Sequence, residues 1–205
     1  MAGSDKPWKF IALHKAIYSN GSHFDDDDIV AIRAQLLPLM NELDIDLVFQ
    51  GHDHVYMRTD VMKDNAVVST ATETLTYNGL EYTTKIKPDG TIYSINGTIG
   101  VKHYKAKPVE ETNKLFPLGE TVAYFEIPTY SYIQIDGDTL YFDSYAVEGD
   151  GETRVDQFAI VKNATDVPPV DDEPVEETGI LAFLKQIIAK LMSSKLWEFF
   201  AGLIG

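Results

Sequence analysis

The hydrophobic pattern of this chain changes character near residue 60. Before that point, residues 8–14 (WKFIALH) and 45–51 (IDLVFQG) are short apolar runs that predict buried strands. Between them, apolar side chains recur at helical spacing from residue 29 to residue 43, behind an acidic cluster that suits a helix N-terminus. Pro38 falls inside this pattern and predicts a kink or an early stop. The order strand, helix, strand predicts a βαβ unit with parallel neighbouring strands.

Beyond residue 60 the helical spacing disappears. Short segments of β-type composition alternate with turn sequences such as PDG, NG and DGD, which predicts a largely antiparallel sheet. The predicted strands are residues 66–77, 80–87, 91–97, 122–128, 131–136, 139–147 and 155–161. The fold class predicted from these patterns is α/β, with a βαβ unit followed by mainly antiparallel strands.

Composition divides the chain into three regions. Residues 8–162 have the pattern of a folded domain. Residues 163–178 contain six acidic residues and three prolines, which predicts an extended linker that repels itself. Residues 179–205 are strongly apolar and predict a helical tail. Charged residues interrupt 180–204 too often for a membrane-spanning helix, so two interpretations stay open: an interfacial membrane helix, or a helical hairpin that packs on protein or self-associates.

Charge and composition exclude several classes of function. The formal net charge is −15, from 32 acidic and 17 basic residues, so binding to nucleic-acid phosphates is disfavoured. The chain has no cysteine, which excludes disulfides and thiolate metal sites. Any metal is therefore held by His, Asp, Glu, Asn or Tyr. No apolar run precedes residue 8, so an export signal of the native protein would lie upstream.

Three of the five histidines stand where the two predicted buried strands end. His14 closes the first strand, and His52 and His54 follow Gly51 at the end of the second. Carboxyl ends of parallel neighbours meet at one edge of a sheet, so we expect these imidazoles to converge. In an extended segment the two rings of the His-x-His pair would point the same way, whereas a sharper loop would let them diverge toward two metal ions. Gly51 allows a close backbone approach or an unusual dihedral angle.

The stretches around these histidines resemble a known family. Residues 11–14 (IALH) resemble the fourth motif of binuclear metallophosphoesterases, and residues 51–54 (GHDH) resemble their fifth. The longer stretches HKAIYSNGSHF and GHDHVYMR are similar to the purple acid phosphatase branch of the calcineurin-like superfamily, with Ala16 where proline is usual. The resemblance covers about residues 8–162. It implies the C-terminal half of a metallophosphoesterase β-sandwich flanked by helices.

The resemblance also implies a metal centre. His14 and His52 would bind one metal ion, and His54 would bind a second; iron, zinc or manganese would serve as the metals. Two ions about 3.5–4 Å apart clamp the phosphoryl oxygens of a phosphate ester and lower the pKa of a bound water, so that hydroxide attacks in line. His103 matches no motif of the family and is interpreted as structural.

Other residues of the matching motifs receive supporting roles from the resemblance. His23 lies in the loop before the helix and would donate a proton to the leaving alkoxide, with a solvated loop residue as the equal alternative. Gly51, Tyr56 and Arg58 would position the ligand loop. Asp53 occupies the variable position of its motif and is not assigned as a ligand.

The resemblance further indicates what the chain lacks. In the family, three motifs upstream of the histidines supply a bridging Asp, a second carboxylate, a Tyr and an Asn, but here the first matching motif begins at residue 11. Residues 137–141 (GDTLY) spell one of those motifs, yet they lie downstream and predict a hairpin turn. We therefore expect a fragment that lacks the N-terminal half of its own domain and is inactive alone. Its exposed sheet edge and apolar face predict self-association.

Two other classes of function stay open. A non-catalytic module would use the scaffold and apolar tail for surface attachment or interaction, and a single-site metal binder would use His14, His52 and His54 alone. The intact histidines favour the enzyme, because a binding module does not need them. The folded domain, acidic linker and apolar tail together predict a bacterial protein located outside the cell or at its surface.

Overall fold

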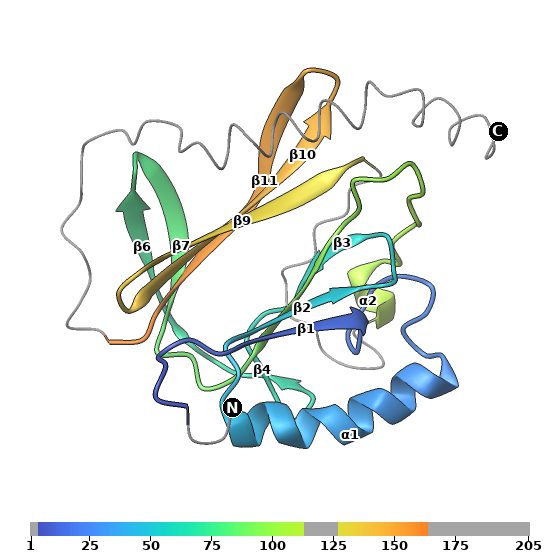
Figure 1. Cartoon of the computed structure of the whole chain (residues 1–205), viewed down its shortest axis with the longest axis horizontal. Coiled ribbons are helices and arrows are strands. Elements are labelled where there is room, and N and C mark those ends of the chain that lie inside the picture. Colours follow the sequence, from blue (N-terminus) through green and yellow to red (C-terminus); the bar gives the residue numbers. More distant parts are fainter. Residues whose placement is uncertain (1–3, 113–126, 164–205) are drawn as a thin grey trace.

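The computed structural model describes residues 4–112 and 127–163, without the side chains of Val109 and Thr112. These residues form a mostly β structure with one long helix, arranged in three layers (Figure 1). Helix α1 covers one face of a four-stranded sheet, and a five-stranded sheet covers its other face. The four-stranded sheet has the order β1–β2–β8–β3, with bounds Phe10–Lys15, Leu47–Gly51, Ile92–Asn96 and Tyr56–Arg58.

The four-stranded sheet contains the predicted βαβ unit. Strand β1 pairs with β2 in parallel, and helix α1 (Asp27–Leu43) connects them, so the prediction of parallel neighbours is confirmed. The helix runs through Pro38, so the expected early stop is wrong. Pro38 removes only one helical hydrogen bond and is exposed, whereas Ile29 and Met40 on either side of it in the sequence are buried. Tertiary packing of this apolar face outweighs the local cost of the proline.

The five-stranded sheet has the order β6–β7–β11–β10–β9. Its strands are Ala71–Tyr77, Leu80–Ile86, Gly151–Val161, Thr139–Glu148 and Thr129–Asp136. Its pairs are antiparallel except β7 with β11, so the predicted mainly antiparallel arrangement is confirmed. Strand β8, also beyond residue 60, pairs in parallel with β2 in the four-stranded sheet. Gly137 has φ 55° in the turn between β9 and β10, which confirms that GDTLY belongs to a hairpin.

Some predicted segments differ from the structure or lie outside the described residues. The single strand expected over 66–77 is two strands in the structure, β5 (Ala66–Val67) and β6. Strand β5 pairs with β4 (Met62–Lys63). A short helix, α2 (Val109–Thr112), was not predicted. Most of the predicted strand 122–128, the linker beyond residue 163 and the tail 179–205 lie outside the described residues. Among the described helices, none is long and apolar enough to cross a membrane.

The central position of the four-stranded sheet explains the composition of its strands. Val48 belongs to the core beneath α1, whereas its neighbour Leu47 packs with Phe142 and Phe158 of the five-stranded sheet. A sheet that is covered on both faces has nearly continuous apolar strands rather than alternating ones. This arrangement accounts for the unbroken apolar run of residues 47–49.

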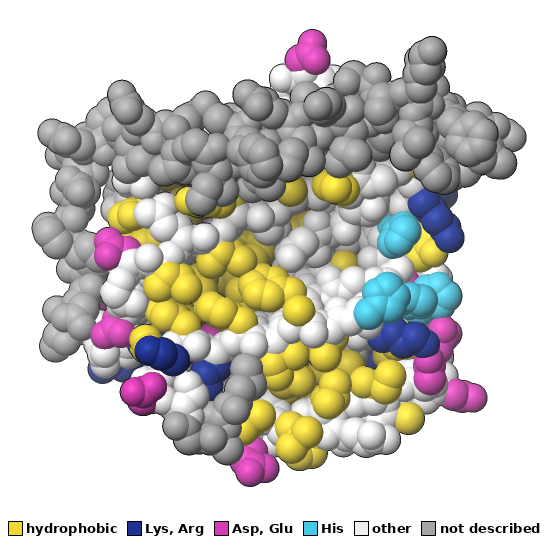
Figure 2. All heavy atoms as spheres, viewed as in Figure 1, with side chains coloured by type: hydrophobic (Ala, Val, Ile, Leu, Met, Phe, Trp, Pro, Cys, Tyr) yellow, Lys and Arg dark blue, Asp and Glu magenta, His cyan; other side chains and the backbone are white. Residues whose placement is uncertain are grey.

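Among the described residues, each of the two larger sheets has an edge strand at either end, and β1 and β9 are two of these edge strands. Within the described residues, β1 pairs only with β2, and β9 pairs only with β10. Phe10, Ile11 and Leu13 on β1 are only half-buried, and Ile135 on β9 is 44% exposed. Figure 2 shows apolar side chains gathered on the face where β1 and β9 lie in front. Unpaired apolar edges of this kind favour association with another strand.

We expect the full chain to self-associate through the β1 edge at micromolar concentration. Ala12 is an exposed residue of β1, so Ala12→Lys places a charge at the edge without burying it and should lower the molar mass measured by light scattering. Ala34→Lys on exposed α1 is the matched control and should leave the mass unchanged. A monomeric parent chain, or equal effects of the two substitutions, would contradict this prediction.

Candidate metal centre

An irregularity in the β1–β2 pairing positions His14. The strands pair in register from Phe10 to Ala12, with Ala12 opposite Phe49, and pairing resumes with Lys15 opposite Gly51. Three steps along β1 therefore correspond to two steps along β2, which is the geometry of a β-bulge. His14 lies within this bulge. A bulge changes the direction of the side chain that it carries. This bulge lies at the carboxyl end of the parallel pair of strands.

His52 follows β2 in a tight turn with a strained backbone. The backbone N–H of Asp53 donates to the carbonyl of Gly51 at 2.9 Å, and His52 between them has φ 71°. A three-residue turn with positive φ at its centre is rare for residues other than glycine. The unusual dihedral therefore belongs to His52 and not to Gly51. Gly51 instead allows a close approach of two backbones, because a Cβ there would lie 3.3 Å from the carbonyl oxygen of His14.

Three imidazoles gather at these strand ends. The ring centroids of His14 and His52 are 5.3 Å apart, and those of His23 and His52 are 4.7 Å apart. Histidine side chains form a group at one end of the molecule in Figure 2. Two imidazoles that share a tetrahedral zinc ion have ring centroids about 5 Å apart, so the spacing of His14 and His52 fits a shared metal. Partial burial, together with His23, His14 and Lys15, lowers the pKa of His52 and favours the neutral form that binds metal.

His54 points to different partners from His52. Its Nδ1 lies 2.7 Å from the carbonyl oxygen of Lys102, which can only accept, so Nδ1 carries the proton and Nε2 keeps a lone pair for a metal. The ring stacks on Tyr104 with centroids 4.9 Å apart, and the backbone N–H of Tyr104 donates to the carbonyl of His54 at 3.1 Å. His52 therefore contacts His14 and His23, whereas His54 contacts Lys102 and Tyr104.

His23 is partly exposed and contacts an acidic side chain. Its side chain is 36% exposed, and Nδ1 lies 2.8 Å from a carboxylate oxygen of Asp26. The ring also lies 6.1 Å from Tyr104, measured between centroids. A carboxylate at Nδ1 orients the imidazole and leaves Nε2 as the group that can exchange a proton with a ligand.

The described residues bring the imidazoles of His14 and His52 together, with ring centroids 5.3 Å apart, while His54 contacts Lys102 and Tyr104. Within residues 4–112 and 127–163, however, no group of three His, Asp or Glu side chains could hold a metal ion by itself. Asp53 is buried and accepts a hydrogen bond from the Ser19 hydroxyl at 2.5 Å. The described side chains therefore do not complete a metal site by themselves.

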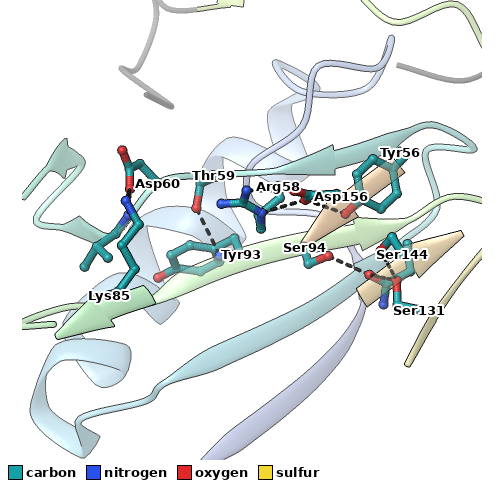
Figure 3. A network of polar contacts seen from close by, with 12 residues as sticks. Tyr56, Arg58, Thr59, Asp60, Lys85, Tyr93, Ser94, Ser131, Ser144 and Asp156 are labelled. Atoms are coloured by element: carbon teal, nitrogen blue, oxygen red, sulfur yellow. Dashed lines mark hydrogen bonds and ion pairs between the residues drawn. The ribbon is translucent and has the colours of Figure 1, made fainter. Parts of the chain in front are cut away.

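Tyr56 and Arg58 face the second sheet instead of the histidines (Figure 3). Arg58 makes two hydrogen bonds to the carboxylate of Asp156 on β11, at 2.7 and 2.8 Å, and the Tyr56 hydroxyl donates to the same carboxylate at 2.7 Å. Burial opposes the charge on Asp156, but the hydrogen bonds and charge of Arg58 outweigh burial and lower the Asp156 pKa. The guanidinium also lies 4.6 Å from the ring centroid of Phe158. These contacts tie the strand after the ligand loop to the five-stranded sheet.

Several residues at the site have no signal in the sequence pattern. Gln50 is buried and bonds to the backbone of residues 17 and 18. Ser19 and Asp53 connect the loop before α1 with the loop after β2. Segment 102–104 lies on His54, although its sequence distance from the histidine motifs is large. Such contacts depend on the packing of distant segments, so local composition could not have indicated them.

Comparison with solved structures places this geometry in a known fold. The chain matches the purple acid phosphatase PPD1 from yellow lupin (Lupinus luteus) seeds with a TM-score of 0.57 and 17% identity. The match covers 86% of this chain but only 30% of the phosphatase, so the likeness to this phosphatase concerns the fold and not the activity.

The other comparisons give no further support for a similarity to known proteins. Vps29 from Chaetomium thermophilum matches with a TM-score of 0.30 and 16% identity, over 75% of this chain and 56% of that protein. This similarity is too low to support an argument. No family model and no curated protein matches the sequence.

We expect His52→Gly to have a free energy of unfolding about 1 kcal/mol higher than His52→Ala, because only glycine adopts a positive φ without strain. Urea unfolding of the two variants measures the difference. The same pair of substitutions at His14, which has no positive φ, should give the opposite order, since glycine there loses more conformational freedom on folding than alanine and gains no relief of strain. If the His52 variants follow the order of the His14 variants, the turn is not strained.

The Asp156 contacts predict a specific pH dependence. Because the folded pKa of Asp156 is lowered, its contribution to stability is complete above the ordinary carboxyl pKa of about 3.9 and is lost as the pH falls through the folded value. Asp156→Asn should therefore destabilise the chain at pH 7, and the difference from the parent should shrink below about pH 4. Urea unfolding of both proteins between pH 7 and pH 3 tests this, and a difference that is constant with pH would contradict it.

Proposed function

We propose that the chain is the histidine-bearing part of a metal-dependent phosphoesterase that hydrolyses phosphate esters. The main support is the convergence of His14 and His52, whose ring centroids are 5.3 Å apart at adjoining strand ends of a metallophosphoesterase-related fold. Because no three-residue metal group occurs among the described residues, the proposal includes a second part of the fold that completes the centre.

In this proposal, His14 and His52 hold one metal ion and His54 holds a second. Bound ions of iron, zinc or manganese would polarise the phosphoryl oxygens and lower the pKa of the attacking water. Neighbouring residues of the chain favour the forms of His52 and His54 that can bind metal. The lowered pKa of His52 keeps its imidazole neutral near pH 7, and the Lys102 carbonyl holds the proton of His54 on Nδ1.

His23 is proposed to act as the general acid. Its Nε2 would give a proton to the alkoxide oxygen of the leaving group as the phosphorus–oxygen bond breaks, so that the product leaves as a neutral alcohol. Asp26 holds Nδ1 at 2.8 Å and orients the ring for this transfer. The position of His23 next to His52, with centroids 4.7 Å apart, supports a role for it beside a phosphate that the metal ions would bind.

The open edge of β1 is the proposed docking place for the missing carboxylates. A strand that pairs with β1 in parallel would bring its carboxyl end next to His14, where bridging ligands are needed. Its occupant in this proposal is the N-terminal half of the same domain. The half-buried apolar residues of β1 would then become fully covered.

A second candidate function is a non-catalytic interaction module. It is favoured by the finding that the described side chains include no group of three that could hold a metal. For either function, the acidic linker and apolar tail support a location outside a bacterial cell or at its surface, which is part of the proposal.

Zinc binding separates these functions. Calorimetric titration of the full chain with Zn²⁺ should show binding that His14→Ala and His52→Ala each weaken at least about tenfold, since each removes one imidazole of a shared ion. His103→Ala, a histidine outside the group, is the control and should bind as the parent does. If the parent shows no binding, or if all three variants bind equally, the metal centre is wrong and the interaction module is favoured.

Turnover tests the need for a second half. The isolated chain should not hydrolyse p-nitrophenyl phosphate in the presence of Mn²⁺, Zn²⁺ or Fe³⁺, because histidines alone cannot hold two cations against their mutual repulsion. Substantial turnover by the pure chain, lost in His14→Ala, would show that the centre is already complete.

A further inference from the structure

We propose that Gln50 is a positioning residue that holds His23 against His52. The side chain of Gln50 docks residues 16–24, here named the His23 loop, onto the end of β2. This role rests on the proposed function only for its catalytic consequence, since the geometric claim concerns the chain alone. Gln50 stands two residues before His52, so one short segment carries both the ligand and the residue that sets its distance from the proton donor.

The amide of Gln50 bonds to the loop as a neighbouring strand would. Its Oε1 accepts hydrogen bonds from the backbone N–H of Ile17 at 2.7 Å and of Tyr18 at 3.2 Å. Its Nε2 donates to the carbonyl oxygen of Tyr18 at 3.1 Å. A side-chain amide offers both a donor and an acceptor in one plane, which few side chains can do.

Burial makes these bonds necessary. Gln50 is 6% exposed, and Ile17 and Tyr18 are fully buried, so water does not compete for their backbone groups. Buried backbone N–H and C=O groups need partners, and the side chain of Gln50 supplies them here. Removing the amide would take away three hydrogen bonds between the end of β2 and the loop, so the loop would be held less closely to β2.

Two further contacts hold the outer parts of the loop. Arg33 donates to the carbonyl oxygens of Ile17 and Phe24, the latter at 2.6 Å. The carboxylate of Asp53 approaches so closely that a Cβ on Gly21 would lie 2.3 Å from its Cγ. The Ser19 hydroxyl also donates to Asp53, beyond the end of β2, at 2.5 Å. Among the described residues, Gln50 is the one whose side chain bonds Ile17 and Tyr18 to β2 itself.

The distances from His52 to His14 and from His52 to His23 therefore depend on different contacts. The spacing of His14 and His52 depends on the pairing of β1 with β2. The spacing of His23 and His52 depends on the His23 loop, and so on Gln50. A defect at Gln50 should disturb the second distance and leave the first one unchanged.

The test is an NMR comparison of the full-length chain with its Gln50→Leu variant. In the parent, ring-proton contacts should connect His52 with both His14 and His23. In Gln50→Leu, the contact between His23 and His52 should disappear while the contact between His14 and His52 stays. The amides of Ile17 and Tyr18 should exchange with solvent about tenfold faster, because each loses its acceptor.

Tyr82→Phe is the control for a general loss of stability. It removes a buried hydrogen bond of 2.9 Å to Asp143 in the five-stranded sheet, away from the histidines, and should leave both ring contacts in place. If Gln50→Leu does not fold, Gln50→Glu replaces it: the carboxylate keeps an acceptor for Ile17 and Tyr18 but loses the donor to Tyr18, so amide protection should stay while the ring contact weakens.

Selective loss of the His23–His52 contact supports the proposal. Retention of both contacts in Gln50→Leu would overturn it, and so would loss of both contacts or a matching loss in Tyr82→Phe. None of these measurements uses metal or substrate, so a failure of the chain to bind Zn²⁺ would count against the proposed function without affecting this result.

Discussion

The parallel pairing of β1 with β2 is the constraint on which the rest of the site depends. It brings the carboxyl ends of the two strands side by side, and the extra residue between Ala12 and Lys15 turns His14 toward the loop that follows β2. The pairing itself exists because the sheet is buried between α1 and the five-stranded sheet, where unpaired backbone groups would be costly. Packing of the two outer layers therefore maintains the distance between the imidazoles.

The ligand loop is held at both of its ends, which explains how it tolerates strain. On one side, β2 is fixed by parallel neighbours, and on the other, β3 is fixed by the contacts of Tyr56 and Arg58 with Asp156. A residue with an unfavourable φ persists only where its surroundings leave no alternative. His52 is in that position, and the same turn sends His52 and His54 toward different partners.

The similarity to the lupin phosphatase is partial, and the sheet that carries the histidines has an open edge. The matched part of the phosphatase is 30% of its length, and the described residues leave β1 unpaired on one side. Imidazoles at the carboxyl ends of β1 and β2 lie next to that open side.

Local patterns in the sequence determined the βαβ unit, the hairpin at Gly137 and the placing of His14 and His52 at strand ends, because spacing of apolar residues and turn chemistry act over a few residues. Only the tertiary structure decided that helix α1 continues through Pro38, that the strained φ falls on His52, and that Gln50 and Asp156 hold the site. These features arise where segments far apart in the chain pack together, and burial there outweighs the local preference of any single residue.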